Sequence, residues 1–77
     1  MNALQSLNLT GAQVVAFDSI TLPDGITKVD RAMFTRNNHF VQVIMYDKSP
    51  QVVVVIDADV QQMHINQIDQ FIQDHTR

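Results

Sequence analysis

The run QVVVVI at residues 51–56 limits what this chain can fold into more than any other feature of its sequence. Valine and isoleucine are β-branched, so they favour extended backbone and pack well on a pleated sheet. The polar segments DKSP and DAD bound the run, which is too short for a buried helix. It therefore predicts a strand that is apolar on both faces. Such a strand needs cover on each face and a hydrogen-bonded neighbour along each edge.

Three earlier segments also have strand character, and turn-forming residues separate them. They are QVVAFDSITL, ITKVDRAMFTR and HFVQVIMY. The first break is PDG, in which proline presets the first turn dihedral and glycine accepts a positive φ. The second break is Asn37-Asn38, and asparagine tolerates the left-handed conformation of tight hairpins. Together with QVVVVI, these segments predict a four-stranded antiparallel meander. An alternative is a helix in the second segment, because Ile26, Val29, Met33 and Phe34 also fit helical spacing.

The register of this meander follows from three expected turns. Two-residue turns at Asp24-Gly25, Asn37-Asn38 and Lys48-Ser49 place apolar residues opposite one another on a single face. The predicted apolar face consists of Val15, Phe17, Ala32, Phe34, Val41, Val43, Met45, Val52, Val54 and Ile56. Because three independent turns agree on one face, the pattern supports the meander.

The C-terminal segment predicts a helix over residues 59–75. Asp59 and Gln62 resemble a capping box at its start. One helical face would carry Val60, His64, Ile68, Phe71, Ile72 and His75. We therefore expect an α+β fold, in which a four-stranded antiparallel meander sheet is packed on one face by a C-terminal amphipathic helix. The expected organisation is a single domain over 1–77, with an arm or short helix at 1–11, the sheet at 12–57 and the helix at 59–75.

The opposite face of the predicted sheet is too apolar for a face exposed to water. It carries Ala16, Ile20, Val29, Met33, Ile44, Tyr46, Val53 and Val55. In a four-stranded meander, QVVVVI would also lie at a free edge. The candidates for cover are the N-terminal arm with Leu4, Leu7 and Leu9, a second copy of the chain, another protein, or a strand order that makes QVVVVI central. Symmetric pairing is the commonest solution in soluble oligomers, so we expect a homodimer. The predicted contact residues are Ile44, Tyr46, Val53 and Val55, with Arg31 and Asp18 at the margin.

The segment VVVVIDADV resembles the first motif of the haloacid dehalogenase phosphatases. The resemblance covers nine residues and implies a nucleophile at Asp57 and a general acid at Asp59. Val60 stands where that family usually has threonine. The family also needs a longer α/β sheet, with a lysine and further acidic motifs downstream. We therefore interpret Asp57 as the end of a strand and Asp59 as a helix cap.

The remaining residues capable of site chemistry are not grouped in the sequence. There is no cysteine, and His64 and His75 would lie about 16 Å apart on one helix, too far to bind one metal ion. We expect these two histidines to be packed within the amphipathic helix, or to form a pH-sensitive contact. The sequence therefore predicts no catalytic, metal-binding or cofactor-binding residue, and a non-enzymatic protein.

The distribution of charge bears on the choice of partner. The formal net charge is −3, and all of it comes from the segment that begins at Asp57. An acidic surface opposes binding to nucleic acid and to anionic lipid. A nucleic-acid-binding module is the alternative function, through Lys28, Arg31 and Arg36 with Phe40 and Tyr46 as stacking residues. No run of about 20 apolar residues and no signal-like leader is present, so we expect a cytoplasmic protein. The predicted function is that of a small protein–protein interaction or regulatory module.

Overall fold

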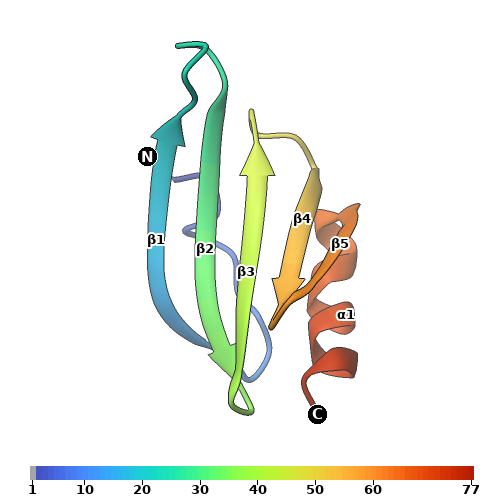
Figure 1. Ribbon diagram of the computed structural model, residues 1–77. Helices are drawn as coiled ribbons and strands as arrows, with labels where there is room; N and C mark the ends of the chain where they lie inside the picture. The colour runs from blue at the N-terminus through green and yellow to red at the C-terminus, as the bar shows by residue number, and fades with distance from the viewer. Residues whose placement is uncertain (1) are drawn as a thin grey trace.

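The computed structural model describes residues 2–77, and its main element is one antiparallel sheet of five strands in the order β1-β2-β3-β4-β5 (Figure 1). The strands are β1 (Gln13–Thr21), β2 (Lys28–Arg36), β3 (His39–Tyr46), β4 (Gln51–Ile56) and β5 (Asp59–His64). A 3₁₀ turn, η1 (Ile65–Gln67), leads into the helix α1 (Ile68–His75). The expected α+β class and the meander are confirmed, with one strand more than predicted.

The predicted pairing of the three central strands is confirmed. Phe34 lies opposite Val41, and Ala32 lies opposite Val43. Val43 in turn lies opposite Val54. Asn37 and Asn38 both have the positive φ of a tight hairpin turn, 50° and 67°. The alternative of a helix in the second segment is wrong, because residues 28–36 pair on both edges as a strand.

The first strand differs from the prediction at its beginning. A β-bulge between Val14 and Ala16 places Val14, rather than Val15, opposite Phe34. Val15 is therefore exposed and does not belong to the buried face. Beyond the bulge the predicted register holds, since Phe17 lies opposite Ala32. A bulge inserts one unpaired residue into one strand, which a count of alternating apolar residues does not reveal.

The predicted helix over residues 59–75 is wrong in its first half. Residues 59–64 form β5, which pairs with β4 across a two-residue turn at Asp57-Ala58. Asp57 accepts a left-handed φ of 56°, as such a turn requires. The capping box lies at His64 and Gln67 instead of Asp59 and Gln62. At a free edge of β4, the backbone N–H and C=O groups would lack partners within the sheet, and β5 supplies these partners. Residues 59–64 therefore form a strand instead of the first part of the predicted helix.

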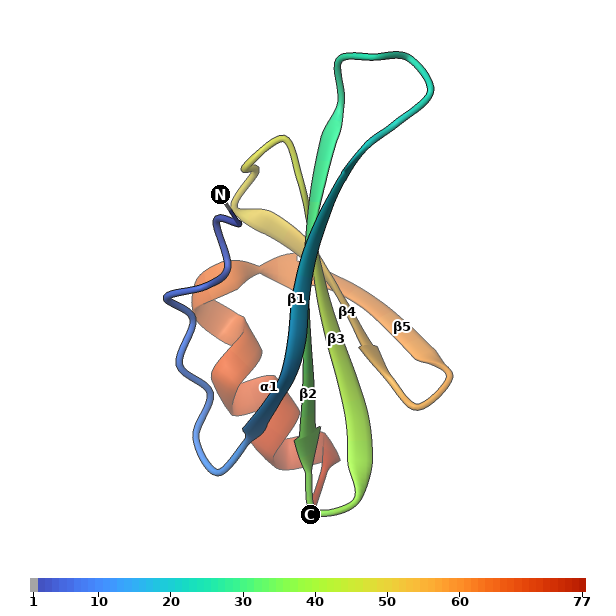
Figure 2. The same ribbon diagram turned by 90° about the vertical axis from the view of Figure 1, so that its left-hand side faces the viewer.

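One face of the sheet, which we call the inner face, carries the core. The N-terminal arm, residues 2–12, and α1 both lie over this side, as the edge-on view shows (Figure 2). Leu4, Leu9, Ile68 and Ile72 are buried against the inner residues of the strands. The strand residues in this core are Ala32, Phe34, Val41, Val43, Met45, Val52, Val54 and Ile56. The arm is an irregular segment of turns rather than a helix, and Met1 lies outside the described residues.

Polar contacts fix the arm to the sheet and to the helix. The side-chain amide of Asn2 donates to the backbone oxygens of Asp18, at 2.6 Å, and Arg31, at 3.1 Å. The backbone N–H of Thr10 donates to Asp69 of α1 at 2.9 Å. The arm is therefore held in place over the inner face. It does not cover the opposite face of the sheet, as one candidate arrangement required.

Candidate interaction surface

The face opposite the core, which we call the outer face, carries no other segment of residues 2–77 (Figure 2). The paired strands form two rows across it. One row reads Asp18, Arg31, Ile44, Val53 and Gln62, and the other reads Ala16, Met33, Gln42, Val55 and Val60. A shorter row at one end consists of Ile20, Val29 and Tyr46. The outer face is therefore mainly apolar and crosses all five strands.

All six predicted contact residues lie on the outer face. Ile44, Val53 and Val55 are half-buried by their neighbours alone, and Tyr46 remains 46% exposed. Arg31 and Asp18 lie in the same row as Ile44 and Val53, one and two strands away from Ile44, respectively. The structure thus brings the six residues together on one surface. Alternation along the strands and the predicted pairing of all four strands were sufficient to group them.

Three further residues of this face, Gln42, Val60 and Gln62, were missed. Val60 is 64% exposed and lies opposite Val55, because its segment is a strand rather than a helix. Gln42 lies between Met33 and Val55 and is polar, so the pattern of apolar residues does not include it. The alternation of HFVQVIMY, followed without regard to polarity, would have found Gln42.

A charged pair bridges the first two strands on the outer face. The guanidinium of Arg31 donates from Nε to Asp18 Oδ1 at 3.0 Å and from Nη2 to Asp18 Oδ2, so the pair is bidentate. Arg31 Nη1 also donates to Gln42 Oε1 at 3.3 Å. The hydrogen bond from Arg31 holds the pKa of the Asp18 carboxyl below its usual value, and the same contact raises the pKa of Arg31. The pair leaves this part of the surface electrically neutral.

A shallow hollow of about 230 Å³ lies beside the charged pair. It is lined by Asp18, Ile20, Val29, Arg31, Ile44 and Tyr46. Val29, which is only 8% exposed, forms its floor. Ile20 and Tyr46 stand on either side of Val29 in the pairing and remain about half exposed. The hollow therefore has an apolar floor and a charged rim, as anchor pockets at protein interfaces commonly do.

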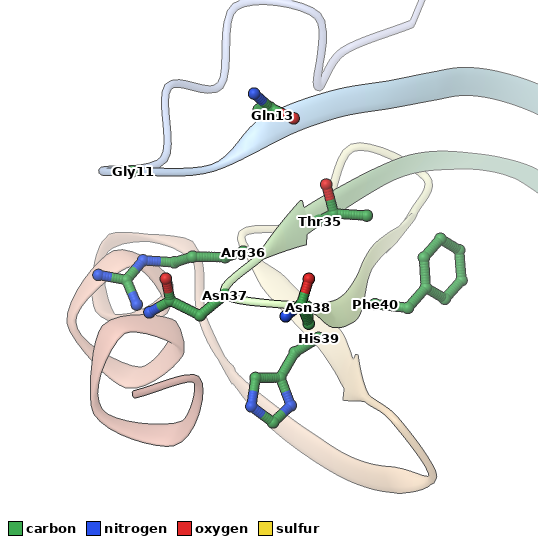
Figure 3. A pocket seen from close by; sticks show the side chains of 8 residues that line it. All are labelled: Gly11, Gln13, Thr35, Arg36, Asn37, Asn38, His39 and Phe40. Carbon is green, nitrogen blue, oxygen red and sulfur yellow. The ribbon is translucent and has the colours of Figure 1, made fainter.

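A second hollow, of about 690 Å³, lies at the turn between β2 and β3 (Figure 3). Its one cationic guanidinium, that of Arg36, is turned toward the end of α1. Arg36 Nε donates to the backbone oxygen of Thr10, and Nη1 donates to Thr76 Oγ1, each at 2.9 Å. Arg36 thus ties the arm and the C-terminal end of α1 to the hairpin. We interpret this hollow as a gap between the arm, the end of α1 and the β2–β3 hairpin, which Arg36 holds together.

The basic residues of the nucleic-acid alternative are not gathered into one surface. Lys28 and Arg36 begin and end β2, and Arg31 between them is bound to Asp18. Arg31 lies on the outer face, while Arg36 reaches over the inner side to Thr76. This arrangement lacks the continuous cationic groove that tracks a nucleic-acid backbone.

The acidic motif and the histidines lie apart from the outer face or at its border. Asp57 is in a turn and pairs with His39, whose Nδ1 lies 2.8 Å from Oδ2 of Asp57. Asp59 begins a strand, so the strand-to-helix connection that the haloacid dehalogenase resemblance implies is not present. Among residues 2–77, no group of three or more histidine and acidic side chains is placed to hold a metal ion.

His64 and His75 are not packed in one helical face, contrary to expectation. His64 ends β5, and its ring nitrogen Nδ1 accepts from the backbone N–H of Asn66 at 3.2 Å. His75 is exposed on α1, where its ring stacks on that of Phe71 with centroids 4.0 Å apart. The first histidine therefore acts in a cap, and the second covers an aromatic ring at the helix end.

No helix among residues 2–77 has both the length and the apolar character needed to cross a membrane. Comparisons with protein-family models, with curated proteins and with solved structures found no match to this chain. The surface itself is therefore the basis for assigning a function.

Proposed function

We propose that this protein is a non-enzymatic interaction module that self-associates through the outer face of its sheet. The observation that carries the proposal is the mainly apolar surface that crosses all five strands and that neither the arm nor α1 covers. Contiguous apolar patches of this kind mark interaction sites in soluble proteins.

The charge of the outer face favours a second copy as the occupant. The chain has a formal net charge of −3, and two such chains repel each other in general. On the outer face, however, the carboxylate of Asp18 is neutralised by Arg31. The acidic residues Asp57, Asp59, Asp69 and Asp74 lie in the last turn, at the start of β5 and on α1. Two outer faces can therefore meet without bringing like charges together.

The size of the outer face also fits a symmetric dimer. Five strands at about 4.8 Å spacing, each about 20 Å long, give a projected face of about 500 Å². The accessible area of protruding side chains exceeds such a projection, and a standard interface buries about 800 Å² per partner. The face is thus large enough to support a stable interface when most of it is buried.

The proposal is tested by placing a charge in the centre of the outer face. Val55→Lys should convert the protein from a dimer to a monomer, because burying an unpaired ammonium at an apolar interface costs several kcal/mol. In the monomer the lysine stem can lie along the sheet and carry its charge into water, so the fold should be kept. Molecular mass by light scattering and the circular dichroism spectrum measure the two effects. Val53→Lys should behave in the same way.

Asn8→Lys is the matched control, because it adds the same charge at an exposed position of the arm. It should leave the dimer intact. A monomeric parent protein, or a Val55→Lys variant that keeps the mass of the parent, would reject self-association through this face.

A further inference from the structure

We infer that the twofold axis of the proposed dimer runs along β3, and that Tyr46 of each copy occupies the hollow of the other. This inference rests on the proposed self-association and specifies its geometry. β3 is the central strand of the five, so an axis along it places every strand of one outer face over a strand of the other. An axis along an outer strand would leave part of each apolar face uncovered.

The positions of the charged pairs favour this axis over one that crosses the strands at the level of those pairs. An axis along β3 places β1 and β2 of one copy over β5 and β4 of the other. The Asp18–Arg31 pair of one copy then faces the row that carries Val53 and Gln62 in the other. An axis perpendicular to the strands near this row would instead set Arg31 over Arg31 of the second copy. Like charges placed directly together at an interface are strongly unfavourable.

The same axis brings the outer residues of β3 next to their own copies. These residues are Phe40, Gln42, Ile44 and Tyr46. Tyr46 is both exposed and one wall of the hollow. A residue close to a twofold axis meets its equivalent, so the two Tyr46 rings can pass each other and each can lie against Ile20 and Val29 of the other copy. Tyrosine is among the commonest anchor residues at protein interfaces, because its ring buries a large area at a low cost in conformational entropy.

Single cysteines test the axis directly, since the chain has no cysteine of its own. Gln42→Cys places a thiol beside the inferred axis, where its copy lies across a sheet separation of about 10 Å. Gln62→Cys places a thiol in β5, two strands from β3, so that its copy lies about 19 Å away along the sheets. A short bismaleimide should therefore link Gln42→Cys into a covalent dimer and should leave Gln62→Cys unlinked.

Each outcome of this experiment decides between arrangements. Linking at Gln62→Cys, or equal linking at both positions, would overturn the axis along β3. A dimeric parent in which neither cysteine is linked would overturn it as well. A parent that is monomeric by light scattering would reject the proposed function itself, so the two failures are distinguishable.

Variants of Tyr46 test the anchor. Tyr46→Ala should weaken the dimer about 30-fold or more, which is the size of effect that defines a hot spot. Tyr46→Phe keeps the ring and should change the dissociation constant by no more than about fivefold. Ile26→Ala is the control, because Ile26 is 79% exposed in the loop between β1 and β2 and away from the outer face. A Tyr46→Ala variant that dimerises as well as Ile26→Ala would refute the anchor, and sedimentation equilibrium measures all three.

Discussion

The two faces of the sheet are built from the same strands but are completed in different ways. On β4, Val52 and Val54 point inward and are fully buried, whereas Val53 and Val55 point outward and are only half-buried. The inner face is covered by the chain's own arm and helix. The outer face has an ion pair and a hollow but no cover from residues 2–77. The arm and the helix therefore complete the core on the inner face only, and they leave the outer face uncovered, as the proposed self-association requires.

Two neighbouring residues of β2 face opposite sides of the sheet, and we expect the largest difference in the free energy of unfolding between their alanine variants. Phe34→Ala removes a ring that is 2% exposed on the inner face and should lower the free energy of unfolding by about 3–5 kcal/mol. Met33→Ala, on the half-buried outer face, should cost the isolated chain about 1 kcal/mol. Urea denaturation at a concentration where the protein is monomeric measures both. Equal losses would mean that the two faces do not differ in their contribution to the fold.

A smaller effect is expected from the arm. Leu4 is 1% exposed beneath the inner side of the sheet, so Leu4→Ala should lower the free energy of unfolding by about 2–4 kcal/mol. Gln5→Ala, at an exposed position of the same arm, should change it by less than about 0.5 kcal/mol. If Leu4→Ala were as stable as Gln5→Ala, the arm would not be part of the core in solution.

The smallest expected effect is on the pH dependence of stability, and it compares one aspartate on each face of the sheet. Asp30 is buried on the inner side, where its carboxylate accepts from Ser19 Oγ at 2.6 Å and from the backbone N–H of Ala3 at 3.1 Å. The hydrogen bond from Ser19, with that from Ala3, holds the pKa of Asp30 below its ordinary value of 3.8. The unfolded chain therefore binds a proton at a higher pH than the folded one. The stability that Asp30 contributes is full above its unfolded pKa and is lost as the pH falls through its folded pKa.

This dependence is measured as the urea midpoint between about pH 6 and about pH 3. Over this pH range, the urea midpoint of Asp30→Asn should fall by less than that of the parent protein. The pKa of Asp18 is also lowered, by its hydrogen bond with Arg31, but in the monomer, where both variants are compared, that pair lies at the surface and water screens it. Asp18→Asn should therefore change the acid dependence less than Asp30→Asn does. The reverse order would contradict the assignment of the stabilising contacts to the inner face.

The sequence was sufficient to predict the pairing of β2, β3 and β4 and the side of the sheet to which their residues belong. Strict alternation in β3 and β4, with Asn37-Asn38 between β2 and β3, determines which side chains face each other. Three features were not predictable from alternation. The bulge at Val15 inserts one residue into β1, and the loop from Leu22 to Thr27 is longer than a two-residue turn, although it keeps the same register. The predicted two-residue turn at Lys48-Ser49 is wrong, because residues 47–50 connect β3 to β4, again with the predicted register.

The fifth strand was missed because DVQQMH fits a helix and a strand almost equally well. Val60 and His64 have helical spacing, while Asp59, Gln61 and Met63 alternate with Val60, Gln62 and His64 in the strand. Tertiary context decides the outcome, since β4 needs a hydrogen-bonded neighbour and a two-residue turn at Asp57-Ala58 supplies one. The requirement that β4 have a hydrogen-bonded neighbour on each edge, applied to residues 59–64, would have favoured a strand there.

The most direct measurement compares the four consecutive valines of β4 by methyl NMR in the presence of a soluble paramagnetic agent. At high protein concentration all four valines, Val52 to Val55, should be shielded from the agent. On dilution, Val53 and Val55 should become accessible while Val52 and Val54 remain shielded, because only the outer face is uncovered when two copies separate. Broadening of Val53 and Val55 to the same extent at every concentration would contradict the claim that a second copy covers the outer face.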